Sequence, residues 1–217
     1  MAINTYATLI SAVSEWLGRD QDATLTARIP DLITLAEAKF NRALQHPKME
    51  TRSTTDVDTT STDPEFITLP SDFQSMRRVR LSGVTGKPRL SFMSQTQLDD
   101  YRYSIDNVED QPVYFTISGT EMELAPTPGE DYELEMVYRA NISALTSGNT
   151  TNWLLTLAPD LYLYAVLMEA SPYLKNDERI AVWASGYQSA LEQLNTHGFR
   201  QSFDSGPSSI TLPGIVP

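Results

Sequence analysis

Residues Asn152 to Arg179, NWLLTLAPDLYLYAVLMEASPYLKNDER, contain two helix starts and an apolar face rich in tyrosine. Pro159 suits a first helical position, and Asp160 after it faces the positive end of the helix. The inward stripe that follows at helical spacing consists of Leu161, Tyr164, Leu167 and Met168. Pro172 should end or kink this helix because proline lacks an amide donor, and Asn176 can cap the next one. The stretch offers almost no group for catalysis, which indicates assembly rather than chemistry.

Helical spacing is also found on both sides of this stretch. A first helix is predicted after Thr5, with Gly18 in the left-handed position that ends it. A second helix is expected to begin near Pro30 and to stop at Pro47. The last helix should run to about Gly198 on a long apolar stripe, formed by Ile180, Trp183, Ala184, Tyr187, Leu191 and Leu194.

The middle of the chain changes to a period of two, which is typical of half-buried strands. Between Met76 and Leu81, valine and leucine alternate with arginine, and Val113 to Ile117 alternates in the same way. Further alternating runs separated by turn residues predict a meander of antiparallel strands. Ser94 to Tyr103 resembles a short helix, and the polar segment Thr51 to Pro64 is expected to form an exposed loop.

These patterns predict an α+β fold: a bundle of about four helices with an inserted antiparallel β-rich module and an extended C-terminal tail. The expected boundaries are 1–50 and 151–198 for the helical core, 51–150 for the insertion and 199–217 for the tail. The tail has three Pro and three Gly between positions 198 and 217, yet it keeps apolar residues, among them Phe203, Ile210, Leu212, Ile215 and Val216. We expect a strap that docks on a partner, for example as an added β-strand; a strap on its own domain or a frayed end is the alternative.

Composition limits the classes of function. The chain has 217 residues, a formal net charge of -12 and no cysteine. The negative charge opposes sequence-independent nucleic-acid binding, because such binding depends on Lys and Arg neutralising phosphates. Without cysteine there is no disulfide or thiolate nucleophile, so a cytoplasmic origin is the default expectation. Neither a secretory signal nor a membrane span is recognised, so we expect no membrane partner.

The residues for enzymatic chemistry are sparse. His46 and His197 are the two histidines, and both lie near predicted helix ends, where a cation or polar group is favourable. The spacing of metal-binding, phosphate-binding and nucleophile-elbow motifs does not occur, so we expect no cofactor, no metal and no catalytic residue. Many acidic residues could supply the carboxylate pair of a glycosidase, but strand alternation places four of them on the solvent side: Glu121, Glu123, Glu133 and Glu135.

Charge is unevenly distributed within the predicted β-module. The segment Met76 to Leu90 carries Arg77, Arg78, Arg80 and two further cations but no acid, whereas Asp99 to Glu135 is acidic apart from Arg102. The basic and acidic strands can be partners in one sheet, where opposite charges stabilise cross-strand pairs. They can also face each other between subunits, which would give the head-to-tail complementarity of a ring. Both explanations remain open from the sequence.

The tyrosines near the third helix are the other interface candidates. Tyr and Trp are enriched where proteins meet, although some are needed for the core. We expect Tyr164 to be buried and Tyr162 and Tyr173 to be exposed, where they can contact a neighbouring subunit.

A set of segments along the chain resembles one family. They are NTYATLISAVSEWLGRD from Asn4, RIPDLITLAEAKFNRAL from Arg28, METRSTT, ITLPSDF with MRRVRL, YFTISGTEMELAPTP, and the stretch from Asn152 extended to Trp183. Together they resemble tailed-bacteriophage head-to-tail adaptor proteins, also described as head completion or connector proteins. The resemblance reaches from the N-terminus to about Leu194.

The resemblance implies a structural virion protein without catalysis. Its expected location is the neck of the virion, after assembly in the host cytoplasm, as a dodecameric ring beneath the portal. Its expected partners are the portal protein, copies of itself and a downstream neck or tail protein, and genome DNA would pass through the ring without specific binding. The tail residues Phe203 and Ile210 to Val216 would contact the portal. The alternatives are a stopper or tail tubular protein, or an acidic carbohydrate-active enzyme.

Overall fold

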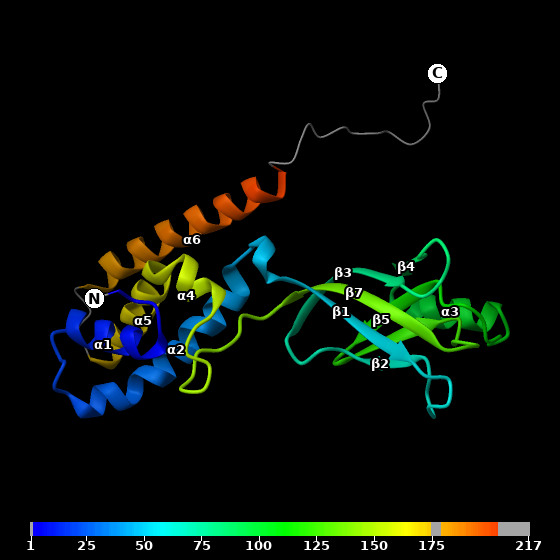
Figure 1. Cartoon of the computed structure of the whole chain (residues 1–217), viewed down its shortest axis with the longest axis horizontal. Coiled ribbons are helices and arrows are strands. Elements are labelled where there is room, and N and C mark those ends of the chain that lie inside the picture. Colours follow the sequence, from blue (N-terminus) through cyan, green and yellow to red (C-terminus); the bar gives the residue numbers. More distant parts are fainter. Residues whose placement is uncertain (1, 175–178, 204–217) are drawn as a thin grey trace, which may run out of the picture. The chain divides into compact units, whose positions relative to one another are not determined.

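The computed structural model describes residues 2–174 and 179–203, with side chains to residue 199, and divides the chain into two compact units (Figure 1). A helical unit is formed by Met1–Met49 together with Ile142–Pro217, and a β unit by Glu50–Asn141. The β unit is thus inserted between two helical segments. Within the described residues, none of the helices combines the length and apolar character needed to span a membrane.

The helical unit contains five α-helices among the described residues. They are α1 (Tyr6–Trp16), α2 (Ala23–Ala43), α4 (Trp153–Leu157), α5 (Pro159–Tyr173) and α6 (Ile180–Phe203), with a short 3-10 turn, η1 (Pro47–Met49). The predicted cap of α1 is confirmed, since the Thr8 N–H donates to Thr5 Oγ1 at 3.2 Å. Asn152 caps α4 in the same way, because its Oδ1 accepts the Leu155 N–H at 2.8 Å.

The predicted start of the second helix at Pro30 is wrong. Asp22 Oδ1 accepts the N–H groups of Thr24 and Leu25 at 3.0 and 3.1 Å, which starts α2 about two turns earlier and leaves Pro30 inside the helix. The last helix also continues beyond the predicted end at Gly198, so the first residues of the expected tail are helical. Gly198 packs against His46 and Pro47, and this contact offsets the low helix propensity of glycine.

The core of the helical unit lies where α2, α5 and α6 pack on one another. Phe40 and Tyr162 are fully buried and meet edge to face, with ring centroids 4.9 Å apart. A second aromatic group joins Trp16, Tyr164 and Trp183 at its edge, with centroid distances of 5.7 to 6.3 Å. The half-exposed Trp16 therefore completes the cover of the core rather than projecting freely from α1.

The β unit contains a mixed sheet of seven strands that curls into a nearly closed barrel, with α3 (Gln95–Ser104) beside it. The strands are β1 (Glu50–Val57), β2 (Phe66–Thr68), β3 (Phe73–Leu81), β4 (Arg89–Phe92), β5 (Tyr114–Ser118), β6 (Glu121–Ala125) and β7 (Tyr132–Ala140). Their order in the sheet is β1-β7-β3-β4-β5-β6-β2. The inward side chains, such as Leu81, Leu124 and Leu134, form a core within this unit.

Three local predictions for the β unit need correction. The sheet is not wholly antiparallel, because α3 forms the crossover connection that lets β5 run parallel to β4. Thr51 to Val57 is not a loop but most of β1, which pairs with β7; its threonines suit an exposed strand. Val113 precedes β5 and is 43% exposed, so it is not part of the inward set. The short helix beginning after Ser94 is confirmed.

Candidate functional site

The charged cluster of the β unit is built around Glu135 on β7. This carboxylate is 1% exposed and accepts hydrogen bonds from three arginines. The distances are 2.7 Å from Arg52 Nε, 2.8 Å from Arg80 Nη2 and 3.2 Å from Arg78 Nη2. The hydrogen bonds from Arg80 and then Arg52 lower the pKa of Glu135 to about 2, so the carboxylate is ionised at neutral pH.

Strand register explains this cluster. Arg80 lies directly opposite Glu135 in the β3–β7 ladder, whereas Arg52 and Arg78 both lie opposite Val137, two residues further along β7 on the same face. All three guanidinium groups can therefore converge on one carboxylate. The prediction that Glu135 faces solvent is wrong, because the arginines on the outer face of the sheet cover it.

Glu123 on β6 is likewise not on the solvent side. It is 7% exposed and its Oε1 lies 3.2 Å from Arg102 Nη2, while Glu65 Oε1 lies 3.5 Å from Arg102 Nη1. Arg102 projects from α3, which packs against β5 and β6. Burial raises the pKa of Glu123, and the nearby Arg102 opposes this rise. Periodicity alone missed this burial because the covering helix is remote in sequence.

The two explanations of the uneven charge can now be compared residue by residue. Arg78, Arg80 and Glu135 pair within one sheet of one chain, as the first explanation has it. Arg77 has one exposed ion pair, with Glu50 at 3.4 Å, and Glu121 and Glu133 are exposed at the surface of the β unit. Arg77, Glu121 and Glu133 thus stay available for a contact with another subunit.

The tyrosine predictions divide in the same way. Tyr162 is fully buried, so its predicted exposure is wrong: α5 is apolar on most of its surface and packs between α2 and α6. Tyr164 is only partly buried, at the aromatic cluster with Trp16 and Trp183. Tyr173 is 47% exposed, and its role as a contact stays a prediction.

The predicted partner-binding tail falls mostly outside the described residues. Ile210, Leu212, Ile215 and Val216 lie there, while Phe203 is the last residue of α6, where only the backbone is described. The histidines are described, and their rings stack with centroids 6.0 Å apart. His46 Nδ1 accepts the Lys48 N–H at 3.2 Å, which is a structural role. Across the described residues, no three His, Asp or Glu side chains are gathered so that they could hold a metal ion.

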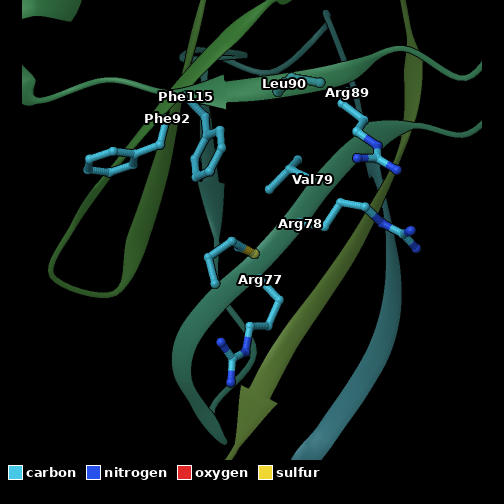
Figure 2. Close-up of a pocket in the computed structure, with 8 residues that line it drawn as sticks. Arg77, Arg78, Val79, Arg89, Leu90, Phe92 and Phe115 are labelled. Atoms are coloured by element: carbon cyan, nitrogen blue, oxygen red, sulfur yellow. The ribbon is translucent and has the colours of Figure 1, made fainter. Parts of the chain in front are cut away.

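The β unit has a hollow of about 440 Å³ between β3 and the β4–β5 pair. We call it the arginine hollow; its lining residues are Met76, Arg77, Arg78, Val79, Arg89, Leu90, Phe92 and Phe115. Figure 2 shows Phe92 and Phe115 on one side of Val79, with Arg78 and Arg89 on the other. Phe92 is 64% exposed, so its ring is open to solvent at the hollow.

The hollow exists because β3 and β4 pair over only a short length. Their ladder joins Val79 with Leu90 and Arg80 with Arg89, and β4 then pairs with β5 instead. The β3–β4 ladder therefore stops at Val79, next to the residues Met76 to Arg78 that line the hollow. The sequence analysis did not identify Phe92 or Arg52 as residues of this region. For Arg52, the period of two among the surrounding Ser and Thr residues could have indicated a strand.

Ion pairs that hold the sheet together, exposed charges and a hollow lined by both arginine and phenyl side chains are features of a protein that works by binding other proteins. A sequence model of the SU10 adaptor protein family matches residues 4–211. The chain therefore belongs to that family of phage head-to-tail adaptors. No curated protein matches it. Family membership implies a structural, non-enzymatic component of the virion neck that binds neighbouring neck and portal components.

Proposed function

We propose that copies of this chain form a dodecameric ring beneath the portal, which joins the capsid to the tail and leaves a channel for DNA. The observation that carries this proposal is the family match over residues 4–211, which includes both the helical unit and the β unit. A ring needs two different surfaces on each copy, because each subunit contacts its neighbours head to tail. The uneven charge of the β unit supplies two such surfaces.

The exposed residues of the predicted interface support contacts between copies. Arg77 on β3 is accessible, and so are Glu121 at the start of β6 and Glu133 near the start of β7. Tyr173, at the end of α5, is a further contact residue in the helical unit. Such rim charges set orientation and association rate more than affinity.

The portal contact is assigned to the C-terminal tail. Residues Phe203, Ile210, Leu212, Ile215 and Val216 bring apolar side chains to a segment with three prolines after residue 203. An extended apolar segment binds well in a groove or along a sheet edge of a partner. The tail of each copy would thus hold the ring to the portal.

The negative charge suits the passage of DNA. With a net charge of -12, a lumen lined by carboxylates would repel phosphates and prevent the genome from adhering. A stopper or tail tubular protein would share this property and is the second candidate. The acidic carbohydrate-active enzyme is disfavoured, because Glu65 and Glu123 are paired with Arg102 and Glu135 with three arginines.

Negative-stain electron microscopy of the purified chain, alone and mixed with the portal protein, tests the proposal. We expect ring-shaped particles with a central opening, seated beneath the portal and twelve-fold in class averages. A ring that binds only below another neck protein would identify a stopper instead. Particles that never associate with portal at any ratio would count against the adaptor ring.

A further inference from the structure

The β unit carries like charges at two places where strands face each other. Arg80 on β3 lies directly opposite Arg89 on β4, beside the arginine hollow. Asp56 on β1 lies directly opposite Glu133 on β7. Like charges in such positions destabilise a sheet, and the cost is removed when an opposite charge approaches.

The hollow and the arginine cluster beside it carry more positive charge than the acidic side chains of the same chain neutralise. Glu135 is shared by Arg52, Arg78 and Arg80, so three cations meet one anion. Arg89 is exposed and makes no ion pair within the described residues. The whole chain has a net charge of -12, but this region is positively charged and is therefore suited to bind an acidic surface.

An acidic surface lies at one edge of the sheet, around the end of β1 and the start of β7. We call it the acidic end; its residues are Asp56, Asp58, Asp63, Asp131 and Glu133, all of them exposed. Asp131 Oδ1 accepts from the Thr59 N–H at 2.9 Å, which holds the loop after β1 close to the β6–β7 turn. Between Ser53 and Met76 the chain has no Lys or Arg to neutralise this end.

The two surfaces cannot meet within one β unit. Arg78 of the hollow lies opposite Val137, whereas Asp56 lies opposite Glu133, which is about 13 Å further along β7. Arg89 is on β4, which is separated from β1 by β7 and β3 and therefore lies about 14 Å across the sheet from it. The loop from Asp58 to Glu65 leaves β1 in the direction away from Arg52. The arginine hollow can therefore receive the acidic end only from a second copy.

We infer that the acidic end of one copy docks at the arginine hollow of the next copy in the ring. Carboxylates of Asp56 and Asp63 would face Arg77 and Arg89, and the half-exposed Phe66 beside the loop would reach the exposed ring of Phe92. Because the contact joins two different surfaces, the acidic end and the arginine hollow, it can repeat from copy to copy. A constant rotation between neighbouring copies then closes the assembly into a ring. This inference rests on the proposed ring and names the surfaces that form it.

Disulfide trapping tests the contact, and the chain is suited to it because it contains no cysteine. Ser61 is exposed in the acidic loop, and Ser91 is exposed on β4 between two residues of the hollow. We expect a Ser61→Cys variant mixed with a Ser91→Cys variant to give covalent dimers under mild oxidation, and the double variant to give a ladder. Covalent dimers also accumulate from a weak, short-lived contact, so the experiment does not require stable rings.

The matched control replaces Ser91→Cys with Ser11→Cys, an exposed serine of α1. Equal dimer yields with Ser11 and Ser91 would overturn the inference. Rings in the micrographs without a 61–91 disulfide would also overturn it while leaving the proposed function intact. A 61–91 disulfide without portal binding would support the docking contact and count against the adaptor ring.

Charge reversal gives a second, independent measurement. Arg77→Glu with Arg89→Glu should lower the yield of the 61–91 disulfide roughly tenfold, because like charges then face each other. Adding Asp56→Lys and Asp63→Lys to the partner variant should restore the yield. Arg28→Glu, an exposed reversal in the helical unit, should leave it unchanged. A loss without restoration would contradict the assigned pairing of surfaces.

Discussion

The hydroxyl of Tyr162 on α5 donates a hydrogen bond to Glu37 Oε1 on α2, at 3.0 Å in the interior of the helical unit. The same oxygen accepts the Leu145 N–H at 2.9 Å, and Asn152 Nδ2 donates to the Tyr162 hydroxyl at 2.7 Å. This network attaches the segment that returns from the β unit to two helices. Tyr162 is therefore a structural residue of the core.

Tyr162→Phe should lower the free energy of unfolding by about 1 to 3 kcal/mol, because two buried hydrogen bonds are lost, one from Asn152 Nδ2 and one to Glu37 Oε1. Urea denaturation followed by circular dichroism measures this change. Tyr173→Phe is the control, since Tyr173 is 47% exposed and should be neutral. Equal effects of both variants would refute the structural role of the network.

Glu37→Gln should change how stability depends on pH. Burial raises the pKa of Glu37 above 4.5, although the Leu145 N–H and the Tyr162 hydroxyl oppose the rise. The contribution of Glu37 is thus fully present below pH 4.5 and is lost as pH rises through the raised pKa. We expect the variant to gain stability relative to wild type as pH increases towards 7. Glu192→Gln, at an exposed site on α6, should follow wild type at every pH.

Glu135→Gln should destabilise the β unit at neutral pH, because three guanidinium groups lose their shared anion. The pKa of Glu135 is lowered to about 2, so its contribution is complete above pH 4.5 and is lost as pH falls through about 2. The stability difference between wild type and variant should therefore shrink over this acid range. Parallel denaturation curves with Glu121→Gln, an exposed glutamate of β6, provide the comparison.

Gly198→Ala should loosen the attachment of α6 to the end of α2. A Cβ at this position would lie 2.7 Å from His46 Cδ2 and 2.9 Å from Pro47 Cδ, which is closer than van der Waals contact. Overpacking of this kind costs about 1 to 3 kcal/mol. Thermal unfolding of the variant measures the cost. Gly148→Ala is the control and should be tolerated, because the nearest atom to its added Cβ would be 3.8 Å away. If Gly198→Ala melted at the same temperature as wild type, the close packing at Gly198 would be contradicted.

Removal of Asp204 to Pro217 should abolish portal binding while leaving the helical content unchanged, since α6 ends at Phe203. Co-sedimentation with portal and far-ultraviolet circular dichroism measure the two quantities. Ile210→Asp with Leu212→Asp should reproduce the loss in the full chain, whereas Ser208→Asp with Ser209→Asp should retain binding. Full binding by the truncated chain would show that another surface contacts the portal.

Local sequence signals predicted the elements whose cause is local. Thr5 and Ser94 cap helices through atoms within three residues, and the alternation at Val79 and Leu81 matches their burial. The helical spacing after Pro159 also gives the position of α5. These features depend on backbone geometry that neighbouring residues determine among themselves.

The misassigned residues are those whose environment comes from distant parts of the chain. The sequence predicts an exposed Tyr162, but α2 packs against this residue and buries it. The sequence also predicts a solvent-exposed Glu123, but Arg102 of α3 pairs with it. The sequence predicts a loop for Thr51 to Val57, but in the structure this segment pairs with β7 as a strand. Hydrogen bonds and burial that join residues more than 20 positions apart leave no period in the sequence.

The sequence by itself determined the α+β class, the acidic charge, the absence of cysteine and the resemblance to the adaptor family, because each depends on composition or local order. The tertiary structure alone decided which charges are used inside the chain. It placed three arginines on Glu135, and it left Arg89 on β4 and Asp56 on β1 directly opposite like charges, with β7 and β3 between these two strands. The physical reason is strand register, which sets the cross-strand neighbours of each residue and cannot be read from one strand.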